Sequence, residues 1–342
     1  MTVLGRQMSQ EMDEQPDALA RIAGRFDSFV QELRRHGADS RHGLAVLARG
    51  SSDNAARVAA YAAQARSGAP VSFLTPSVYT AYGQSPEAYA SWLVLALSQS
   101  GRTPEIVDLA VSCREAGALV IGVTNDGDSP LAAASDVPVV LGVGEEKAVP
   151  ATKTVTAQML AGLAVANALG GPRVAAVELD ALAGQARQVL DDGDAVQALG
   201  MELAASGALA LVGRGFCDAA AFESALKLQE TAGIAAHGFS TADFRHGPVH
   251  LAHAGVPVIG FAGDGPADDD TRDLIGSLRT DGRLARLVGS GEEADIGLPT
   301  TTPELTAILA TIRGQQLALA VSRARGVDPD QPEGLSKVTP TV

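Results

Sequence analysis

The sequence predicts an α/β protein made of two similar halves, each a parallel sheet with helices on both faces. Apolar runs of strand length alternate with helical segments, as in "GLAVLARGSSDNAARVAAYAAQA". Strands that alternate with helices pair in parallel, and helices then cover both faces of their sheet. The second half repeats the first at one fixed spacing, which predicts two tandem domains.

The composition sets the class of protein and its surroundings. The 342 residues suffice for about two domains. Hydrophobic residues make up 46% and charged residues 19%, which allows a sizeable core. The net charge of −14 argues against nucleic acid or an anionic membrane as the main partner, since either favours a basic face. Cys113 and Cys217 predict buried thiols in a reducing compartment, and no apolar run has membrane length, so we expect a cytoplasmic protein.

The elements follow in order. Residues 1–36 predict an N-terminal helical segment, because apolar residues from Ile22 to Leu33 recur at helical spacing. Residues 37–190 predict a first domain, with further strands in "WLVLALSQSG", "ALVIGVTNDG" and "VPVVLGVG". Residues 191–326 predict a second domain. The tail 327–342 is rich in proline and turn residues, and its composition alone predicts a frayed end.

The duplication rests on two matches at the same spacing. "LAVLARGSSDNAA" begins at Leu44 and "LALVGRGFCDAAA" begins at Leu209, 165 residues later. The next strands, "VLALSQSG" from Val94 and "IGFAGDGP" from Ile259, repeat that spacing. Chance explains one such match more easily than two, so we interpret the halves as a repeat.

A polar loop follows the strand "LVLAL", and its hydroxyl and amide residues are Ser98, Gln99, Ser100 and Thr103. Ser51 and Ser52 follow the preceding strand. In open α/β sheets, anions bind beyond the carboxyl ends of strands, near helix N-termini. The equivalent loop of the second half reads "GDGP", with a carboxylate that would repel an anion, so folding does not require the hydroxyls. We favour a phosphate loop over an ordinary polar turn.

The stretch "ESALKLQETAGIAAHGFSTADFRHGPVHLAH" holds the candidate acids and bases. Glu223, Lys227 and Glu230 lie on one helical face, which suits either a solvated ion pair or proton transfer beside a carbonyl. His246 precedes Gly-Pro and reads as a loop histidine that can carry a proton. With His250 and His253 it has a loosely metal-like spacing, but Gly-Pro breaks the helix that would align them, so we expect no metal. Lys337 suits either a surface charge or attack on a sugar carbonyl.

Six ordered motifs resemble the sugar isomerase (SIS) domain family: "ARGSSDN", "LSQSGRTPE", "VPATKTVTAQ", "ESALKLQE", "RHGP" and "GVDPDQPEGLSKVT". The sequence is most similar to the isomerase half of glucosamine-6-phosphate synthases and to the related glucosamine-6-phosphate deaminases. The resemblance implies two tandem SIS domains with flavodoxin-like sheets, in a homodimer that needs no cofactor. It implies that the substrate phosphate is held by Ser98, Gln99, Ser100 and Thr103, with Ser51 and Ser52 beside them.

The resemblance also implies the catalytic roles. Glu230 matches the acid/base that moves a proton between C1 and C2. His246 matches the ring-opening histidine, which in this family reaches the partner subunit's site. Lys337 matches the tail lysine that engages the open-chain carbonyl, and Lys227 matches a supporting lysine. The tail 327–342 then becomes an active-site lid.

The resemblance leads us to expect an amino sugar phosphate deaminase/isomerase that converts glucosamine 6-phosphate to fructose 6-phosphate and ammonia. The printed chain has no glutaminase domain, so we expect the ammonia-releasing direction. Alternatives are a phosphosugar aldose–ketose isomerase, a fructosamine-phosphate deglycase and a non-catalytic sugar phosphate sensor. Three positions depart from the synthases: Pro150 and Ala151 replace an alanine and a substrate-binding serine, and His237 replaces a glutamate. Losing a hydrogen-bonding side chain can change which sugar is preferred.

Overall fold

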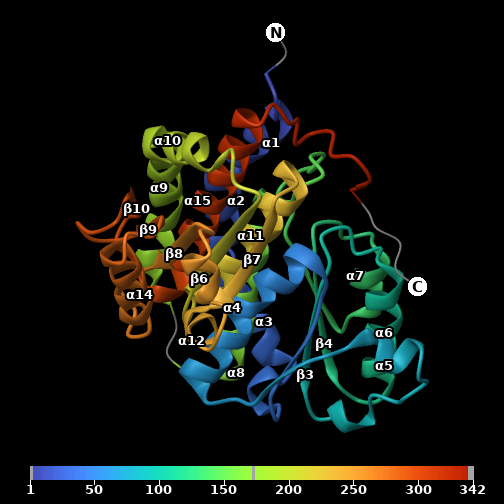
Figure 1. Ribbon diagram of the computed structural model, residues 1–342. Helices are drawn as coiled ribbons and strands as arrows, with labels where there is room; N and C mark the ends of the chain where they lie inside the picture. The colour runs from blue at the N-terminus through green and yellow to red at the C-terminus, as the bar shows by residue number, and fades with distance from the viewer. Residues whose placement is uncertain (1–2, 172–173, 338–342) are drawn as a thin grey trace. The chain divides into compact units, whose positions relative to one another are not determined.

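The computed structural model describes residues 3–171 and 174–337, and these form two compact units, each built on one five-stranded sheet (Figure 1). The first-sheet unit comprises Ala18–Glu146 and Lys153–Asp180 among the described residues. The second-sheet unit comprises, among the described residues, 3–17, Lys147–Thr152 and Ala181–Lys337. The domain ranges 37–190 and 191–326 expected from the repeat remain predictions.

The first sheet is entirely parallel, in the strand order β2-β1-β3-β4-β5. Its strands are β1 (Leu44–Leu47), β2 (Val71–Phe73), β3 (Leu93–Leu97), β4 (Leu119–Thr124) and β5 (Val137–Val140). Its helices are α3 (Phe26–Arg35), α4 (Gly50–Ser67), α5 (Pro76–Thr80), α6 (Pro104–Glu115), α7 (Pro130–Ala134) and α8 (Lys153–Leu169), with the short 3₁₀ helices η1 (Ala38–Ser40) and η2 (Glu87–Tyr89). Helices α2 (Gln15–Ala23) and α9 (Ala176–Asp191) run across the boundaries between the units.

The second sheet is also parallel, in the order β10-β9-β8-β6-β7. Its strands are β6 (Ala208–Gly213), β7 (Ala235–Ser240), β8 (Val258–Ala262), β9 (Ala285–Gly289) and β10 (Ile296–Gly297). The helices of this unit are α1 (Arg6–Asp13), α10 (Asp194–Leu203), α11 (Cys217–Ala232), α12 (Thr241–Arg245), α13 (His250–His253), α14 (Asp269–Thr280) and α15 (Pro303–Ala324).

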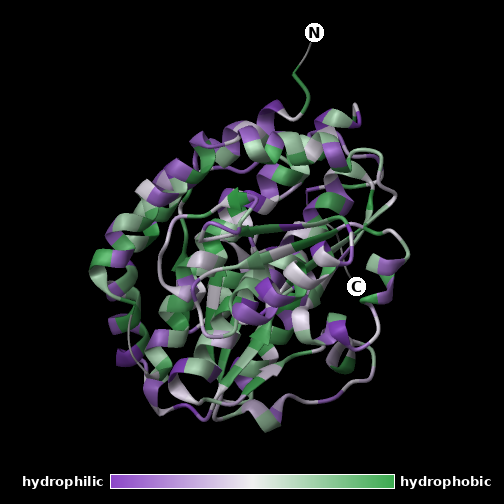
Figure 2. Cartoon of the chain, turned by 60° about the vertical axis from the view of Figure 1, so that its left-hand side comes forward, coloured by the Kyte–Doolittle hydropathy of each residue, from purple (hydrophilic) through white to green (hydrophobic). Residues whose placement is uncertain are grey.

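Hydrophobic burial explains why these segments form strands. Every residue of β1, β3 and β4 is buried, as expected for parallel strands with both faces covered. The register places Leu44 of β1 against Leu93 of β3, and Val94 against Val120 of β4. In Figure 2 the helices alternate between hydrophilic and hydrophobic segments, which is typical of helices that pack one face on a sheet.

Both sheets have the flavodoxin-like arrangement, in which the first strand of the unit lies between the second and the third. The order in which successive strands are added to the sheet therefore reverses between β1 and β3, and between β6 and β8, while all strands stay parallel. Ligands of open α/β sheets bind at this reversal, beyond the carboxyl ends of the strands. The predicted α/β class and the repeated parallel sheets are confirmed. Within the described ranges, no helix is both long and apolar enough to cross a membrane.

The turn after β3 depends on Gly101, which has a φ of +61°. A Cβ atom there would lie 2.2 Å from Ser129 Oγ and 2.7 Å from Thr124 Oγ1. Any other residue would therefore meet both backbone strain and a collision.

We expect Gly101→Ala to lower the free energy of unfolding by well over the ~1–2 kcal/mol that a left-handed alanine costs alone. Gly68→Ala is the matched control, because Gly68 has a φ of +67° and no atom within 4 Å of its added Cβ. Urea denaturation of both variants checks this, and equal losses would contradict the collision argument.

Candidate active site

The polar loop after β3 gathers its hydroxyls around the start of α6. Ser98 is buried, and its Oγ accepts a hydrogen bond from the Gly101 backbone N–H at 3.2 Å. Thr103 Oγ1 lies 3.3 Å from Ser98 Oγ, although Thr103 occupies the N-cap position of α6 and makes no side-chain cap there. Ser100 Oγ accepts from the Arg102 N–H at 3.2 Å. These hydroxyls and the uncapped helix N-terminus form an arrangement that can hold an oxyanion.

The loop after β1 contributes the second group of hydroxyls. Helix α4 begins at Gly50, so Ser51 and Ser52 lie in its first turn. Ser51 is half-buried and Ser52 is 9% exposed. Because β1 and β3 are neighbours in the sheet, both loops leave it at the same edge. The structure thus brings the two predicted hydroxyl groups to one reversal point, at the N-termini of α4 and α6.

The arginines of these loops already have carboxylate partners. Arg49 contacts Glu105 at 3.2 Å, and Arg102 contacts Asp126 at 2.8 Å. The hydrogen bond from Arg102 lowers the pKa of Asp126 below its ordinary value. Neutral donors, namely hydroxyls and backbone N–H groups, are therefore the main means of holding an anion here.

In the second sheet, the loops equivalent to those with the predicted phosphate-binding hydroxyls are occupied by the protein's own side chains. Cys217, 165 residues after Ser52, is buried, and burial followed by the nearby Asp268 raises the pKa of its thiol. Asp268 Oδ2 accepts from the Gly265 N–H at 2.8 Å, and Asp264 accepts from Ser290 Oγ at 2.6 Å. Carboxylates thus occupy the loop that follows β8, which makes it unsuitable for an anionic ligand.

Helix α11 carries a buried lysine between two carboxylates. The side chains of Lys227 and Glu223 are both 0% exposed, with Nζ 3.4 Å from Glu223 Oε1. Lys227 also donates a hydrogen bond to Glu230, whose side chain is 23% exposed. Burial lowers the pKa of Lys227, but the two carboxylates outweigh this, so the pKa is raised above 10.5. The sequence left open whether this face is solvated, and the structure shows that it is buried.

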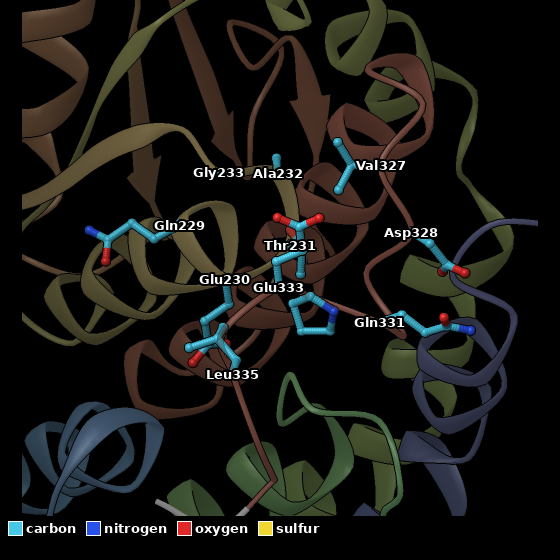
Figure 3. A pocket seen from close by; sticks show the side chains of 11 residues that line it. Gln229, Glu230, Thr231, Ala232, Gly233, Val327, Asp328, Gln331, Glu333 and Leu335 are labelled. Carbon is cyan, nitrogen blue, oxygen red and sulfur yellow. The ribbon is translucent and has the colours of Figure 1, made fainter.

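Glu230 lies at the wall of a cavity of about 570 Å³ formed by the end of α11 and the C-terminal tail (Figure 3). From α11 and the turn after it the lining includes Gln229, Glu230, Thr231, Ala232 and Gly233. From the tail it includes Val327, Asp328, Gln331, Pro332, Glu333 and Leu335. A carboxylate paired with a buried ammonium and facing a cavity is suited to general acid–base chemistry.

The tail is held in place, so the frayed end expected from composition is wrong for residues 327–337. Asp328 Oδ1 accepts from the Gly5 N–H at 2.9 Å. Asp330 accepts from the N–H groups of Gln7 and Met8 at 2.7 and 2.9 Å. These carboxylates satisfy the free N–H groups at the start of α1 and suit its positive dipole end. The remainder of the predicted tail, 338–342, lies outside the described residues.

Lys337 is positioned by a chain of contacts within the second-sheet unit. Its Nζ donates to the Ala148 carbonyl at 2.6 Å. The Ala148 N–H in turn donates to Glu11, whose Oε2 lies at 3.1 Å. Glu11 is 5% exposed on α1 and also accepts from the Lys147 N–H. This segment includes the departures Pro150 and Ala151, which are buried and half-buried respectively.

His246 is not among the residues that line the cavity. It is exposed at the C-terminal end of α12. The preceding Arg245 donates to the Asp270 carboxylate at 3.0 Å, and Arg214 also pairs with Asp270. This pairing ties the segment before His246 to the start of α14. His237, the third departure, is also exposed.

Comparison with known protein families agrees with this architecture. The SIS domain family model matches residues 39–168 and 202–288. The chain belongs to the SIS domain family. It is 30% identical over 353 residues to the glutamine–fructose-6-phosphate aminotransferase (isomerizing) of Halobacterium salinarum, covering 96% of this chain and 58% of that protein. The chain thus spans less than two thirds of the length of the curated relatives it matches.

Solved structures show the same SIS architecture. A Silicibacter pomeroyi DSS-3 protein, provisionally assigned as a phosphosugar isomerase, has a TM-score of 0.81 and 30% identity, covering 96% of this chain and 100% of that one. The glucosamine-6-phosphate deaminase of Thermotoga maritima has a TM-score of 0.78 and 24% identity, covering 97% and 99%. The deaminase, at this identity, supports the fold alone.

Reasoning from the sequence missed several residues that contact the predicted site residues or the tail. Glu11 lies in "EMDEQPDAL", and its buried carboxylate was detectable only as a charged residue on an otherwise apolar helix face. Gln158, whose Oε1 accepts from Ser52 Oγ, is one of two amide side chains, with Asn167, in the otherwise largely apolar helix α8. Asp328 and Asp330 looked like ordinary turn residues.

We expect Lys227→Met to lower the free energy of unfolding by about 3–5 kcal/mol, because it leaves the carboxylate of Glu223 buried without its ammonium. The control is the double variant Glu223→Gln/Lys227→Met, which removes both charges and should recover most of this loss. Urea denaturation measures both. If the double variant is no more stable than Lys227→Met, the loss of the ammonium beside Glu223 is not the cause.

The pH dependence of this loss follows from the raised pKa of Lys227. The folded-state pKa lies above the ordinary 10.5, so the stabilisation is complete below pH 10.5 and is lost as the pH rises through the folded-state pKa. The gap between the native protein and Lys227→Met should therefore narrow above pH 10.5. A constant gap would contradict the charge pairing.

Proposed function

We propose that this SIS protein is an amino sugar phosphate deaminase/isomerase that converts glucosamine 6-phosphate and water to fructose 6-phosphate and ammonia. The observation that carries the proposal is the hydrogen bond from buried Lys227 to Glu230 at the wall of the tail-lined cavity. Two features of the relatives support it. The Halobacterium salinarum relative is named for fructose 6-phosphate amination, and the match covers 96% of this chain.

The first chemical step is ring opening, which exposes the C1 aldehyde. We assign this proton transfer to His246 from the partner subunit, because an exposed imidazole can move a proton near neutral pH. A homodimer is therefore part of the proposal. The substrate phosphate is assigned to Ser98, Gln99, Ser100 and Thr103, with Ser51 and Ser52.

The second step moves a proton from C2 to C1. Glu230 removes the C2 proton, the electron pair forms the C1–C2 double bond of an enolamine, and the C1 carbonyl pair moves to O1, which takes up a proton. Glu230 then returns its proton to C1 while the amino group loses one proton, which gives an imine at C2. Addition of water to the imine releases ammonia and leaves the C2 ketone. Lys227 donates a hydrogen bond to Glu230 and so orients the carboxylate that is assigned as the base. Lys337 is assigned to the open-chain carbonyl, where an ammonium or amine can polarise or attack it.

A phosphosugar aldose–ketose isomerase is the second candidate function. The Silicibacter pomeroyi protein supports it, because that chain is matched over its full length at 30% identity. The proton shift is the same in both reactions, and only the group on C2 differs. Ala151 has no hydroxyl with which to hydrogen-bond the sugar, so this position does not select between an amino group and a hydroxyl on C2. A cytoplasmic location is part of either proposal and agrees with the buried free thiols Cys113 and Cys217.

Incubation of the purified protein with glucosamine 6-phosphate tests the reaction. We expect ammonia and fructose 6-phosphate in equal amounts, and Glu230→Gln should lower kcat by about 10²–10⁴-fold while the substrate still binds. Glu115→Gln, an exposed carboxylate at the end of α6, is the control and should keep full activity. Ketose formation from an unaminated aldose 6-phosphate, without ammonia, would favour the isomerase.

Mixed dimers test the assignment of His246 to the partner's site. Glu230→Gln and His246→Ala subunits should each be inactive alone. When they are mixed at equal amounts and allowed to exchange, a heterodimer has one site with both native groups, so about one quarter of native activity should return. If His246 acts within its own subunit, every site of the heterodimer lacks one group, and no activity returns.

A further inference from the structure

Gln158 is a buried amide that contacts the proposed phosphate site. It lies on α8, is 1% exposed, and its Oε1 accepts a hydrogen bond from Ser52 Oγ at 3.1 Å. Its Nε2 is buried and has no hydrogen-bond partner among the described residues. An amide nitrogen carries two N–H donors, and leaving them unpaired in the interior is costly.

Rotating the terminal amide by 180° exchanges the oxygen and the nitrogen without changing the shape of the side chain. Nε2 then donates a hydrogen bond to Ser52 Oγ. The Ser52 O–H no longer donates to Gln158 and is free to donate to another acceptor. A phosphate dianion offers only acceptors, so it can bind this released donor. The donors then run in one direction, from the amide N–H to the hydroxyl and from the hydroxyl to the anion.

We propose that Gln158 is a positioning residue that turns the Ser52 hydroxyl into a donor for the substrate phosphate. This inference rests on the phosphate assignment made under the proposed function. In the bound state Gln158 donates to Ser52, and Ser52 donates to a phosphate oxygen. Without the anion, the amide adopts the orientation seen in the structure, and the Ser52 hydroxyl donates its hydrogen bond to Gln158 Oε1. The amide therefore favours an acceptor-only anion over ligands whose own donors would compete with the hydroxyl.

The packing of α8 against α4 shields the hydrogen bond between Gln158 and Ser52 from water. An added Cβ on Gly162, one turn beyond Gln158, would lie only 3.1 Å from the Ala59 Cβ of α4. The helices are thus in close contact next to the amide. In the second sheet the residue equivalent to Ser52 is Cys217, which interacts with Asp268 instead.

A double-mutant cycle on ligand binding tests the inference. The probe is glucitol 6-phosphate, which cannot close a ring or be deaminated, with affinity measured by isothermal titration calorimetry. We expect Ser52→Ala and Gln158→Met each to weaken binding by about tenfold, as the loss of a hydrogen bond to a charged group implies. The double variant should bind the probe no more weakly than the single variant with the lower affinity, because Gln158 acts only through Ser52.

The control is Asn167→Leu, a second buried amide near the far end of α8. Asn167 is 4% exposed and bonds to the Leu163 carbonyl and the Val174 N–H. This variant should lose stability and keep its affinity for glucitol 6-phosphate. Thermal unfolding of every variant establishes that each titration is done on folded protein.

Three results would overturn the inference. Native affinity in Gln158→Met shows that the amide has no role in binding. Multiplicative losses in the double variant show that the two residues act independently. Native affinity in Ser52→Ala removes the hydroxyl from the phosphate site, and the inference with it. Because the probe does not react, failure of the proposed deamination would leave this binding result unchanged.

Discussion

The buried ammonium of Lys227 is the constraint on which the candidate site depends. A charge without solvent is retained only where opposite charges and hydrogen bonds compensate for its lost hydration. Glu223 and Glu230 supply both from the same helix. Helix α15 completes the burial, since an added Cβ on Gly314 would lie 1.8 Å from the Ser224 Oγ of α11. The rotation of α11 is thus fixed by the charge at its centre, and the position of Glu230 at the cavity wall follows from it.

The duplication explains how one fold provides two chemistries. Helix α4 of the first-sheet unit and α11 of the second-sheet unit are equivalent in the repeat, since α4 begins at Gly50, the counterpart of Gly215, and α11 begins just after it at Cys217. The positions of α4 that match Lys227 and Glu230 are Ala62 and Ala65. Conversely, the serine at the start of α4 becomes a buried cysteine at the start of α11. Under the proposed assignment, the phosphate contact lies at the start of α4 and the acid–base pair lies on α11, so the two roles do not share a helix.

The fold and the local site patterns were predictable because they are encoded at short range. The alternation of strand and helix patterns predicted the two sheets. The i, i+4 spacing of Glu223 and Lys227 predicted that both side chains lie on one face of their helix. The order of the tail was not predictable, because Asp330 finds its partners at Gln7 and Met8, more than 320 residues away in sequence. The same applies to Glu11, whose carboxylate binds the backbone near Ala148. Such contacts depend on the finished packing of α1, and no local pattern encodes them.

The proposed phosphate site relies on neutral donors in a protein of net charge −14. Arg49 and Arg102 are the nearest arginines in the two loops, and carboxylates already pair with both. When hydroxyls and helix N–H groups bind an anion, their hydrogen bonds replace those that the anion made with water. Binding therefore depends on how these donors are oriented more than on the total charge of the protein. Orientation is therefore the property that the packing around the loops must control. A turn that only glycine can form and a hydroxyl that a buried amide can direct are the two features of the first-sheet unit that provide it.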